Sequence, residues 1–144
     1  MTFLDLADGG RALAPLVEAL RTPGTVVVSA GVGGLVTGAA VADALGIEVT
    51  QLTTTRSESG VSVEIPVDVS GLRVIVVDDG VETGTAARAV GTALREAGAS
   101  HIVLAVPVCP RDAEADLRSR FDEIVAVERP LVRRSLRWHY ENFA

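Results

Sequence analysis

The sequence contains no lysine, one cysteine and only five aromatic residues among its 144 positions. Because all thirteen basic residues are arginines, neither a Schiff-base lysine nor the lysine of a nucleotide-binding P-loop is available. The single cysteine, Cys109, excludes an internal disulfide and fits a reducing cytoplasm. With so few aromatics, the core must consist of Val, Leu, Ile and Ala, which is typical of a parallel sheet covered by helices.

Positive charge is also scarce, since 19 acidic residues outnumber the basic ones and the net charge is −6. This balance argues against general affinity for nucleic acid. A hydrophobic content of 48% with 22% charged residues predicts a globular chain with little disorder. The length suits one domain, residues 1–144, with enough residues to bury a core.

A membrane role is not expected from any segment. Residues 1–10 carry Asp5 and Asp8 without a basic residue, so they do not resemble a secretory signal. Residues 25–42 are uncharged, but their Gly, Ser and Thr content is too high for a membrane-spanning helix. A strand, a turn and a helix explain this run better.

Strand and helix patterns alternate along the chain. The predicted helices cover 10–21, 35–45, 86–97 and 111–120, and the predicted strands cover 25–30, 47–53, 72–77, 101–108 and 124–127. Residues 54–60 are polar and are expected to be flexible, while 61–65 alternate as in an exposed strand or hairpin arm. The alternation predicts an α/β fold with a parallel, Rossmann-like sheet and helices on both faces. The core would span about 25–127, followed by a tail at 128–144.

One strand-to-helix junction carries the strongest chemical signal. The apolar run Val74–Val77 is followed by Asp78 and Asp79, and then by Thr83-Gly84-Thr85 at the start of a helix. Ligands of open α/β sheets bind at this edge, and the free N–H groups of a helix N-terminus attract phosphate. The two carboxylates suit sugar hydroxyls or a divalent cation beside that phosphate. Adjacent strand residues point to opposite faces, so one acid is expected to face the sugar directly.

Residues 74–86 resemble the phosphoribosyl-pyrophosphate signature of the type I phosphoribosyltransferases, which has four apolar residues, two acids, three variable residues, Thr-Gly, one variable residue and a hydroxyl residue. The match departs at its last place, where Ala86 stands, although Thr85 offers a hydroxyl one position earlier. The resemblance implies a single-domain phosphoribosyltransferase-like fold, in which Asp78 and Asp79 hold the ribose hydroxyls directly or through Mg²⁺ and water. Glu82 would lie near a nucleobase and take or hold its proton, so Asp78, Asp79 and Glu82 are the candidate catalytic residues. The implied 5′-phosphate loop consists of Gly80, Val81, Glu82, Thr83, Gly84, Thr85 and Ala86.

A second glycine-rich stretch, Gly31-Val32-Gly33-Gly34, follows a predicted strand and is expected to be a tight loop that an anion can approach. A dinucleotide-binding fingerprint would need Gly or Ala where Val36 stands and an acid at 51–55, and both are absent. Tight strand–helix packing is the other alternative. The resemblance implies that Gly31, Val32, Gly33 and Gly34 form the pyrophosphate loop and that Arg56 belongs to a flexible loop that closes over the donor. A solvated arginine is the alternative for Arg56.

The tail combines arginines with aromatic residues, namely Arg129, Arg133, Arg134, Arg137, Trp138, Tyr140 and Phe143. Stacking on RNA is one interpretation, but packing on the sheet edge or on the partner of a homodimer fits the acidic chain better. Segments 106–108, 121–125 and 140–143 resemble uncharacterised bacterial phosphoribosyltransferase-like proteins, which extends the resemblance over 25–144. His101, His139 and Cys109 are expected to be structural.

The resulting hypothesis is a Mg²⁺-dependent phosphoribosyltransferase that moves ribose 5-phosphate from phosphoribosyl pyrophosphate to a small, nucleobase-like acceptor and releases pyrophosphate. The alternative is a non-catalytic module of the same fold that binds phosphoribosyl pyrophosphate or a nucleotide. A dinucleotide-dependent oxidoreductase is a third alternative, and it would bind at 31–34 without need of the two aspartates.

Overall fold

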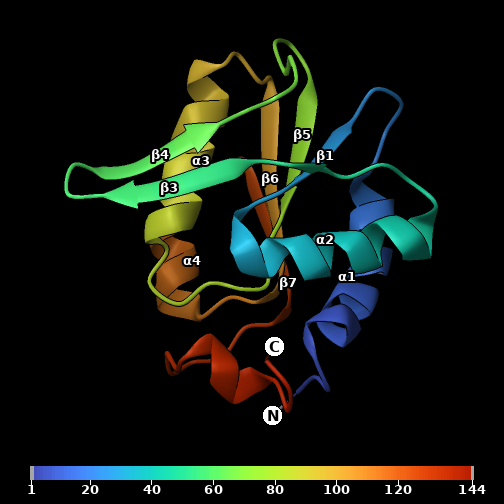
Figure 1. The fold of residues 1–144 in the computed structure, drawn as a ribbon, viewed down its shortest axis with the longest axis vertical. Coiled ribbons are helices and arrows are strands. Elements are labelled where there is room, and N and C mark those ends of the chain that lie inside the picture. Colours follow the sequence, from blue (N-terminus) through green and yellow to red (C-terminus); the bar gives the residue numbers. More distant parts are fainter. Residues whose placement is uncertain (1, 144) are drawn as a thin grey trace.

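The computed structural model describes residues 2–143 and contains a central sheet, four α-helices, a hairpin and a short 3₁₀ helix within that range (Figure 1). The elements are, in chain order, α1 (Leu6–Leu20), β1 (Val26–Ser29), α2 (Gly31–Leu45), β2 (Thr50–Gln51), β3 (Thr53–Ser57), β4 (Gly60–Glu64), β5 (Arg73–Val77), α3 (Thr85–Glu96), β6 (His101–Val108), α4 (Arg111–Leu117), β7 (Glu123–Glu128) and η1 (Leu136–His139). The prediction for β6 matches both boundaries. Helix α1 begins earlier than predicted, because the Asp5 carboxylate accepts the Asp8 N–H (2.7 Å) and caps it.

The five strands of the central sheet are all parallel and lie in the order β2-β1-β5-β6-β7. This confirms the predicted parallel α/β architecture. Strands β1 and β5 are neighbours, and Ser29 pairs with Val77 at the end of both. The carboxyl ends of the two strands that precede the predicted phosphate and pyrophosphate loops therefore meet at one edge of the sheet.

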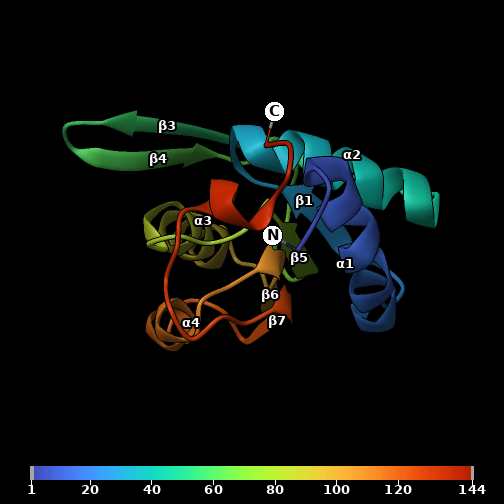
Figure 2. The same cartoon turned by 90° about the horizontal axis from the view of Figure 1, so that it is seen from below.

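Helices cover both faces of the sheet, as predicted (Figure 2). On one face Val27, Ile75 and Val103 pack with side chains of α1 and α2. On the other face Val28, Val76 and the neighbouring strand residues pack with α3 and α4. Because successive strand residues point to opposite faces and both faces are covered, the inner strands β1, β5 and β6 are mostly continuous buried apolar runs without polar alternation.

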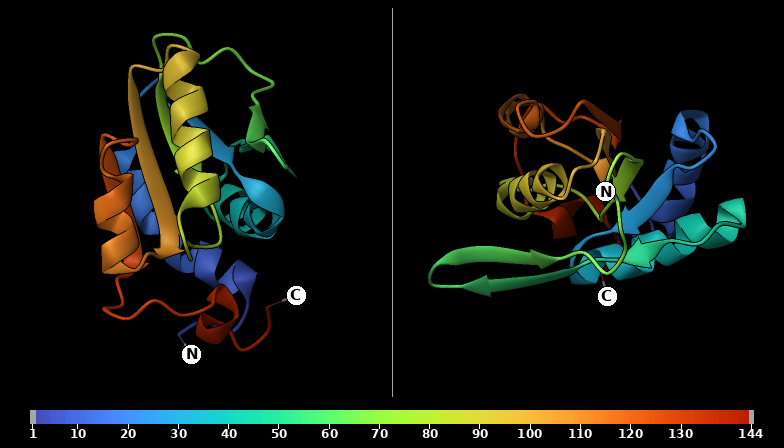
Figure 3. Two further views of the ribbon diagram at one scale, coloured as in Figure 1. Left: turned by 90° about the vertical axis from the view of Figure 1, so that its left-hand side faces the viewer. Right: turned by 90° about the horizontal axis from the view of Figure 1, so that it is seen from above.

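Strands β3 and β4 form an antiparallel hairpin that extends away from the sheet (Figures 1 and 3). The hairpin arm expected at 61–65 is confirmed, but the flexible segment expected at 54–60 is wrong over most of its length, since 54–57 belong to β3. The strand expected at 47–53 is also too long. Only Thr50–Gln51 pairs with β1, after which the chain leaves the sheet for the hairpin.

The tail returns to the start of the chain. Phe3 and Tyr140 form a parallel bridge, and the N–H groups of Thr2 and Phe3 both donate to the His139 carbonyl (3.0 Å each). Tyr140 is buried and Phe143 packs partly against the same small cluster, as expected of a closing segment. Trp138 is an exception, because it stays 46% exposed with the Arg134 guanidinium 4.5 Å from its ring centroid.

No helix within residues 2–143 is both long enough and apolar enough to cross a membrane.

Candidate functional site

The junction between β1 and α2 differs from the predicted loop. Helix α2 begins at Gly31, so Gly31–Gly34 is its first turn and the predicted loop is wrong. Gly31 has φ of 72°, a conformation that glycine adopts without strain, and this lets the chain turn from the strand into the helix at once. The Ala30 N–H donates to the Val77 carbonyl (3.0 Å) and fixes this turn beside β5. The Val32 side chain lies outside the described part of the structure.

Both aspartates of the β5–α3 junction lie against this first turn of α2. A Cβ atom added to Gly33 would overlap the Asp79 carboxyl, whose Cγ would be 2.5 Å away. A Cβ atom on Gly34 would be 3.1 Å from Asp78 Oδ1. Gly33 and Gly34 are therefore required for close packing on the acids.

Both acids line the same cavity, so the opposite orientation of adjacent strand residues does not describe them. That one of them faces the sugar directly stays a prediction. Strand β5 ends at Val77, so Asp78 and Asp79 lie beyond the strand and its alternation no longer directs them. Asp78 Oδ1 also accepts the Asp79 N–H (2.7 Å). The two carboxyls thus form one acidic unit.

Burial controls the protonation of this unit. The pKa of Asp78 is raised well above its usual value, chiefly by burial and further by the negative charge of Asp79. The pKa of Asp79 is also raised by burial, although the hydrogen bond with Asp78 opposes this shift. Two close carboxyls with raised pKa values are a place where a cation or a hydroxyl donor is favourable.

The β5–α3 junction is more open. Residues 78–84 separate the strand from the helix, and Gly84 caps α3 with φ of 87° and without a side-chain hydrogen bond to the first turn. The first backbone hydrogen bond of α3 runs from the Arg88 N–H to the Gly84 carbonyl (2.8 Å). Within the described chain, the preceding N–H groups of Thr85, Ala86 and Ala87 donate to no backbone carbonyl outside the helix. Free N–H groups and the positive end of the helix make this turn suitable for a phosphate.

These parts share a cavity of about 200 Å³ at the carboxyl edge of the sheet. The lining residues are Arg56, Asp78, Asp79, Gly80, Val81, Glu82, Thr83, Gly84, Thr85, Ala86, Ala87 and Leu136. The structure thus brings together the acids, the predicted 5′-phosphate loop and Arg56, which is exposed near the end of β3. Gly31, Gly33 and Gly34 lie against the two acids and are not among the described residues that line the cavity.

The tail closes one side of this cavity, a contact that the sequence did not reveal. The Leu136 N–H donates to Glu82 Oε1, and the Leu136 side chain lies over Gly80, where a Cβ atom would be 2.5 Å from its Cδ2. The Tyr140 hydroxyl donates to the Asp79 carbonyl. Burial raises the pKa of Tyr140, and the charges of Asp79 and Asp78 add to this. Tyr140 and Leu136 follow the acids by some 60 positions in an aperiodic tail, so no spacing pattern could have pointed to them.

The remaining candidates lie away from the cavity. His101 Nε2 is 3.9 Å from a carboxyl oxygen of Glu123, and burial lowers the pKa of His139. Burial raises the pKa of the Cys109 thiol to about 11, which keeps it in the unreactive thiol form. None of the three lines the cavity described above.

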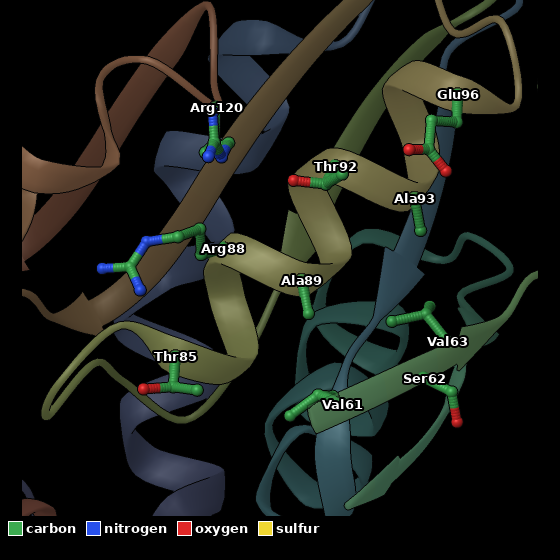
Figure 4. Close-up of a pocket in the computed structure, with 10 residues that line it drawn as sticks. All are labelled: Val61, Ser62, Val63, Thr85, Arg88, Ala89, Thr92, Ala93, Glu96 and Arg120. Atoms are coloured by element: carbon green, nitrogen blue, oxygen red, sulfur yellow. The ribbon is translucent and has the colours of Figure 1, made fainter. Parts of the chain in front are cut away.

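A separate groove of about 490 Å³ runs between β4 and the outward face of α3 (Figure 4). Thr85 belongs to both the groove and the acidic cavity, and Arg88 and Arg120 lie on one side of the groove. Its floor is made of the small side chains Ala89 and Ala93, with Val61 and Val63 opposite. Strand β4 and helix α3 therefore enclose this groove between them, while Val63 also packs against the core.

Comparison with known proteins shows the family to which this chain belongs. The profile of the phosphoribosyl transferase domain matches residues 5–132, so the chain belongs to that family. Two Mycobacterium tuberculosis proteins, from strains CDC 1551 and H37Rv and both named as candidate phosphoribosyl transferases, are 35% identical over 77 residues. That segment covers 54% of this chain but only 17% of the length of each relative.

Solved structures share the fold at low sequence identity. TT1426 from Thermus thermophilus has a TM-score of 0.84 and 23% identity, and the match covers 100% of this chain and 92% of that one. A purine phosphoribosyltransferase from Pyrococcus horikoshii has a TM-score of 0.62 and 23% identity, with 87% and 86% covered. The predicted type I phosphoribosyltransferase fold and family are both confirmed.

Proposed function

We propose that this protein is a Mg²⁺-dependent phosphoribosyltransferase that acts on phosphoribosyl pyrophosphate and a nucleobase-like acceptor. The observation that carries the proposal is the shared cavity, in which an uncapped helix N-terminus lies directly beyond a pair of carboxyls. A phosphate and a diol separated by one sugar ring fit such a pair of features. The single free and buried cysteine suits a reducing cytoplasm, which we propose as its compartment.

Each part of the cavity has a role in this proposal. The N–H groups at 83–87 bind the 5′-phosphate, and Asp78 and Asp79 hold the ribose hydroxyls. Arg56 neutralises the pyrophosphate, and Gly33 and Gly34 let α2 pack closely enough to position the acids. The acceptor nitrogen attacks ribose C1, the bond from C1 to the pyrophosphate oxygen breaks with its electron pair going to that oxygen, and the proton of the acceptor nitrogen passes to the released pyrophosphate or to solvent water. Positioning and charge stabilisation supply most of the catalysis in such a reaction.

The donor set fits magnesium held largely by substrate oxygens and water. Within the described residues, no three His, Cys, Asp or Glu side chains gather closely enough to hold a metal by themselves. Mg²⁺ commonly uses one or two carboxylates together with substrate phosphates, and Asp78 and Asp79 can supply these. When bound, the ion would stabilise the negative charge that develops on the leaving pyrophosphate.

A non-catalytic binding module is the second candidate, and two observations favour it. The Asp79 carboxyl lies directly on Gly33, so the first turn of α2 is not open to pyrophosphate as a free loop would be. Ala86 also places a methyl group where the family signature has a hydroxyl. A module of this kind would bind phosphoribosyl pyrophosphate or a nucleotide but would not catalyse the transfer of ribose 5-phosphate.

Calorimetric titration with phosphoribosyl pyrophosphate, with and without Mg²⁺, followed by an assay of pyrophosphate release with a panel of nucleobases, tests the proposal. We expect Mg²⁺-dependent binding and release with at least one base. The double variant Asp78→Asn, Asp79→Asn should weaken the Mg²⁺-dependent binding while retaining the fold by circular dichroism. Binding without release on any base would favour the binding module, and absence of binding would overturn both.

A further inference from the structure

The side chains of Arg56, Arg88 and Arg120 differ from those of the other arginines. Each of the others pairs with a carboxylate, donates to a backbone carbonyl or lies over an aromatic ring. Within residues 2–143, these three make no such contact. Arg56 lines the acidic cavity, whereas Arg88 and Arg120 both line the groove between β4 and α3. An arginine without an internal partner keeps its donors available for a ligand.

The two arginines of the groove lie on the same side of it. Arg88 comes from the first turn of α3, and Arg120 comes from the turn that follows α4 (Figure 4). Two positive charges on one side of a groove are unfavourable together unless an anion joins them. A phosphate suits this place, because it carries up to two negative charges and offers oxygens to both guanidiniums.

The opposite side of the groove is apolar. Val61 and Val63 of β4 lie across from Ala89 and Ala93 of α3, and all four side chains are partly buried (Figure 4). The groove has a volume of about 490 Å³, which lies within the range of small-molecule sites. Because the alanines are small, a flat ring can approach α3 closely and lie between the two walls.

Polar groups without a partner complete the groove. Thr92 lies on the outward face of α3, and Glu96 lies at the end of the same helix (Figure 4). Among the residues that the structure describes, neither side chain forms a hydrogen bond. Thr92 is available to a sugar hydroxyl, and Glu96 can accept from an amino group. The negative charge of Glu96 also disfavours an anion at its own end, so the anion belongs beside the arginines.

We propose that this groove binds a nucleoside monophosphate, at a site separate from the acidic cavity. The phosphate pairs with Arg88 and Arg120, the sugar lies over Thr92, and the base lies between the alanines of α3 and the valines of β4. The site thus gives the two unpaired guanidiniums their missing partner and covers the apolar walls. Binding in the groove needs no transferase activity and does not rest on the proposed function.

The groove is also placed to regulate the acidic cavity. Thr85 lines both of them. Val61 pairs with Arg56 across the hairpin, and Arg56 lines the acidic cavity. A ligand in contact with Val61 therefore holds the strand pair that carries Arg56, and it favours the binding of an anion by Arg56. Only this regulatory role rests on the proposed function.

Methyl NMR of the chain with isotope-labelled alanine, titrated with adenosine monophosphate, tests the site. Ala89 and Ala93 report on the groove, and Ala86 reports on the acidic cavity. We expect saturable shifts of Ala89 and Ala93, with half-saturation at a concentration at least about tenfold lower than for inorganic phosphate, because the base buries apolar surface. Shifts of Ala86 alone, or no shifts, would overturn the groove site and leave the proposed function untouched. Equal half-saturation for the two ligands would also overturn it, since the apolar walls would then have no use.

Substitutions of the arginines locate the phosphate. The double variant Arg88→Gln, Arg120→Gln should raise the half-saturation concentration at the groove by at least about tenfold, because it removes both charge-assisted pairs. Arg21→Gln is the matched control, since it removes a positive charge at the end of α1, away from the groove, and should change the value by less than about twofold. Thermal melting checks that each variant is folded. A double variant that binds as tightly as the natural chain would overturn the proposal.

The regulatory role is tested on the same samples with inorganic pyrophosphate and Mg²⁺. Adenosine monophosphate should lower the half-saturation concentration of pyrophosphate, observed at Ala86, by about threefold or more in the natural chain but not in the double variant. An equal response of both chains would overturn the regulatory role alone. Failure of pyrophosphate to shift Ala86 in either chain would overturn it together with the proposed function, while the groove site would stand on its own titration.

Discussion

The two strand-to-helix junctions at the carboxyl edge are alike in sequence but differ in structure. Both follow a buried β-branched strand and both contain glycines. At the first, Ala30 alone separates β1 from α2, and the helix begins inside the glycine stretch. At the second, residues 78–84 separate β5 from α3 and leave the helix N-terminus uncapped.

The difference shows that glycine has two separate uses at such an edge. Gly33 is needed because the Asp79 carboxyl occupies the space that a side chain would take. Gly84 is needed because its φ of 87° turns the chain into α3, while a Cβ atom there would meet only ordinary contacts with Leu117 at 3.5 Å. The first junction uses glycine for packing and the second uses it for backbone shape.

The largest expected effect comes from filling the packed junction. Gly33→Ala should abolish detectable binding of phosphoribosyl pyrophosphate and lower the free energy of unfolding by about 1–3 kcal/mol, because the new methyl group overlaps the Asp79 carboxyl. Calorimetric titration and urea unfolding measure the two effects. A variant that binds normally would show that Asp79 can move aside and that the packed junction is not needed to position it.

Gly46→Ala is the control for this variant. Gly46 ends α2 with φ of 64° and has no neighbour within 4 Å of an added Cβ atom. Its replacement should cost about 1 kcal/mol through backbone strain but leave binding unchanged. The pair separates loss of stability from loss of the site.

At the β5–α3 junction, we expect a substitution of Gly84 to act through a change of backbone conformation. Gly84→Val should weaken donor binding by about 100-fold, because a β-branched residue cannot hold φ of 87° and the N–H groups of 85–87 would turn away from the phosphate. The side chain itself would point toward Leu117, so direct blocking of the phosphate is not the cause. Gly46→Val carries similar strain far from the cavity and should bind normally. Equal losses in both variants would contradict the assignment of the phosphate turn.

The sequence predicts the second junction far better than the first. The run Val74–Val77, the acids and the Thr-Gly turn act locally, so their pattern can be recognised without a neighbour. The first turn of α2 could not be predicted, because four residues with three glycines have a low helix propensity, whereas in the structure this turn is helical and packs closely on Asp78 and Asp79. Tertiary contact overrode propensity there.

The sequence analysis missed the hairpin strand β3 and the contact of the tail with Asp79 for related reasons. Strand β3 is exposed on nearly all its residues and shows no alternation, so its Thr-rich sequence resembles a loop. The Tyr140 hydroxyl donates to the backbone carbonyl of Asp79. Every residue type has this carbonyl, so the contact cannot be inferred from the residue at position 79. By contrast, β1, β5 and β7 were predicted to within one residue at each end, and the buried strand β6 at both boundaries.

Substitutions of Glu82 are expected to have a smaller effect, and they test whether this residue holds the tail against the β5–α3 junction. In the structure its carboxylate accepts the Leu136 N–H, so we expect it to anchor the tail and not to act as a general base. Glu82→Gln keeps an acceptor oxygen and should change kcat/KM by no more than about threefold, whereas Glu82→Ala should lower it by about tenfold. A general base would instead lose about 100-fold or more in kcat in both variants.

The smallest expected effect concerns the acid pair that joins the two junctions. Because burial raises the pKa of Asp78 above its value in the unfolded chain, the folded state holds the proton more tightly and its stability falls as pH rises through that window. Asp78→Asn removes this penalty and keeps an oxygen that can accept the Asp79 N–H. We therefore expect Tm to rise by about 2–4 °C at pH 7–8. The gain should shrink as the pH falls and vanish below about pH 3, where the natural carboxyl is protonated in both the folded and the unfolded state. Calorimetric melting across this range measures it, with the exposed Asp116→Asn of α4 as a control that should show no gain. If the Tm of Asp78→Asn at neutral pH equals or falls below that of the natural protein, the first turn of α2 must stabilise the ionised carboxylate of Asp78. The packing of α2 on this acid would then favour its negative charge and would not destabilise the fold.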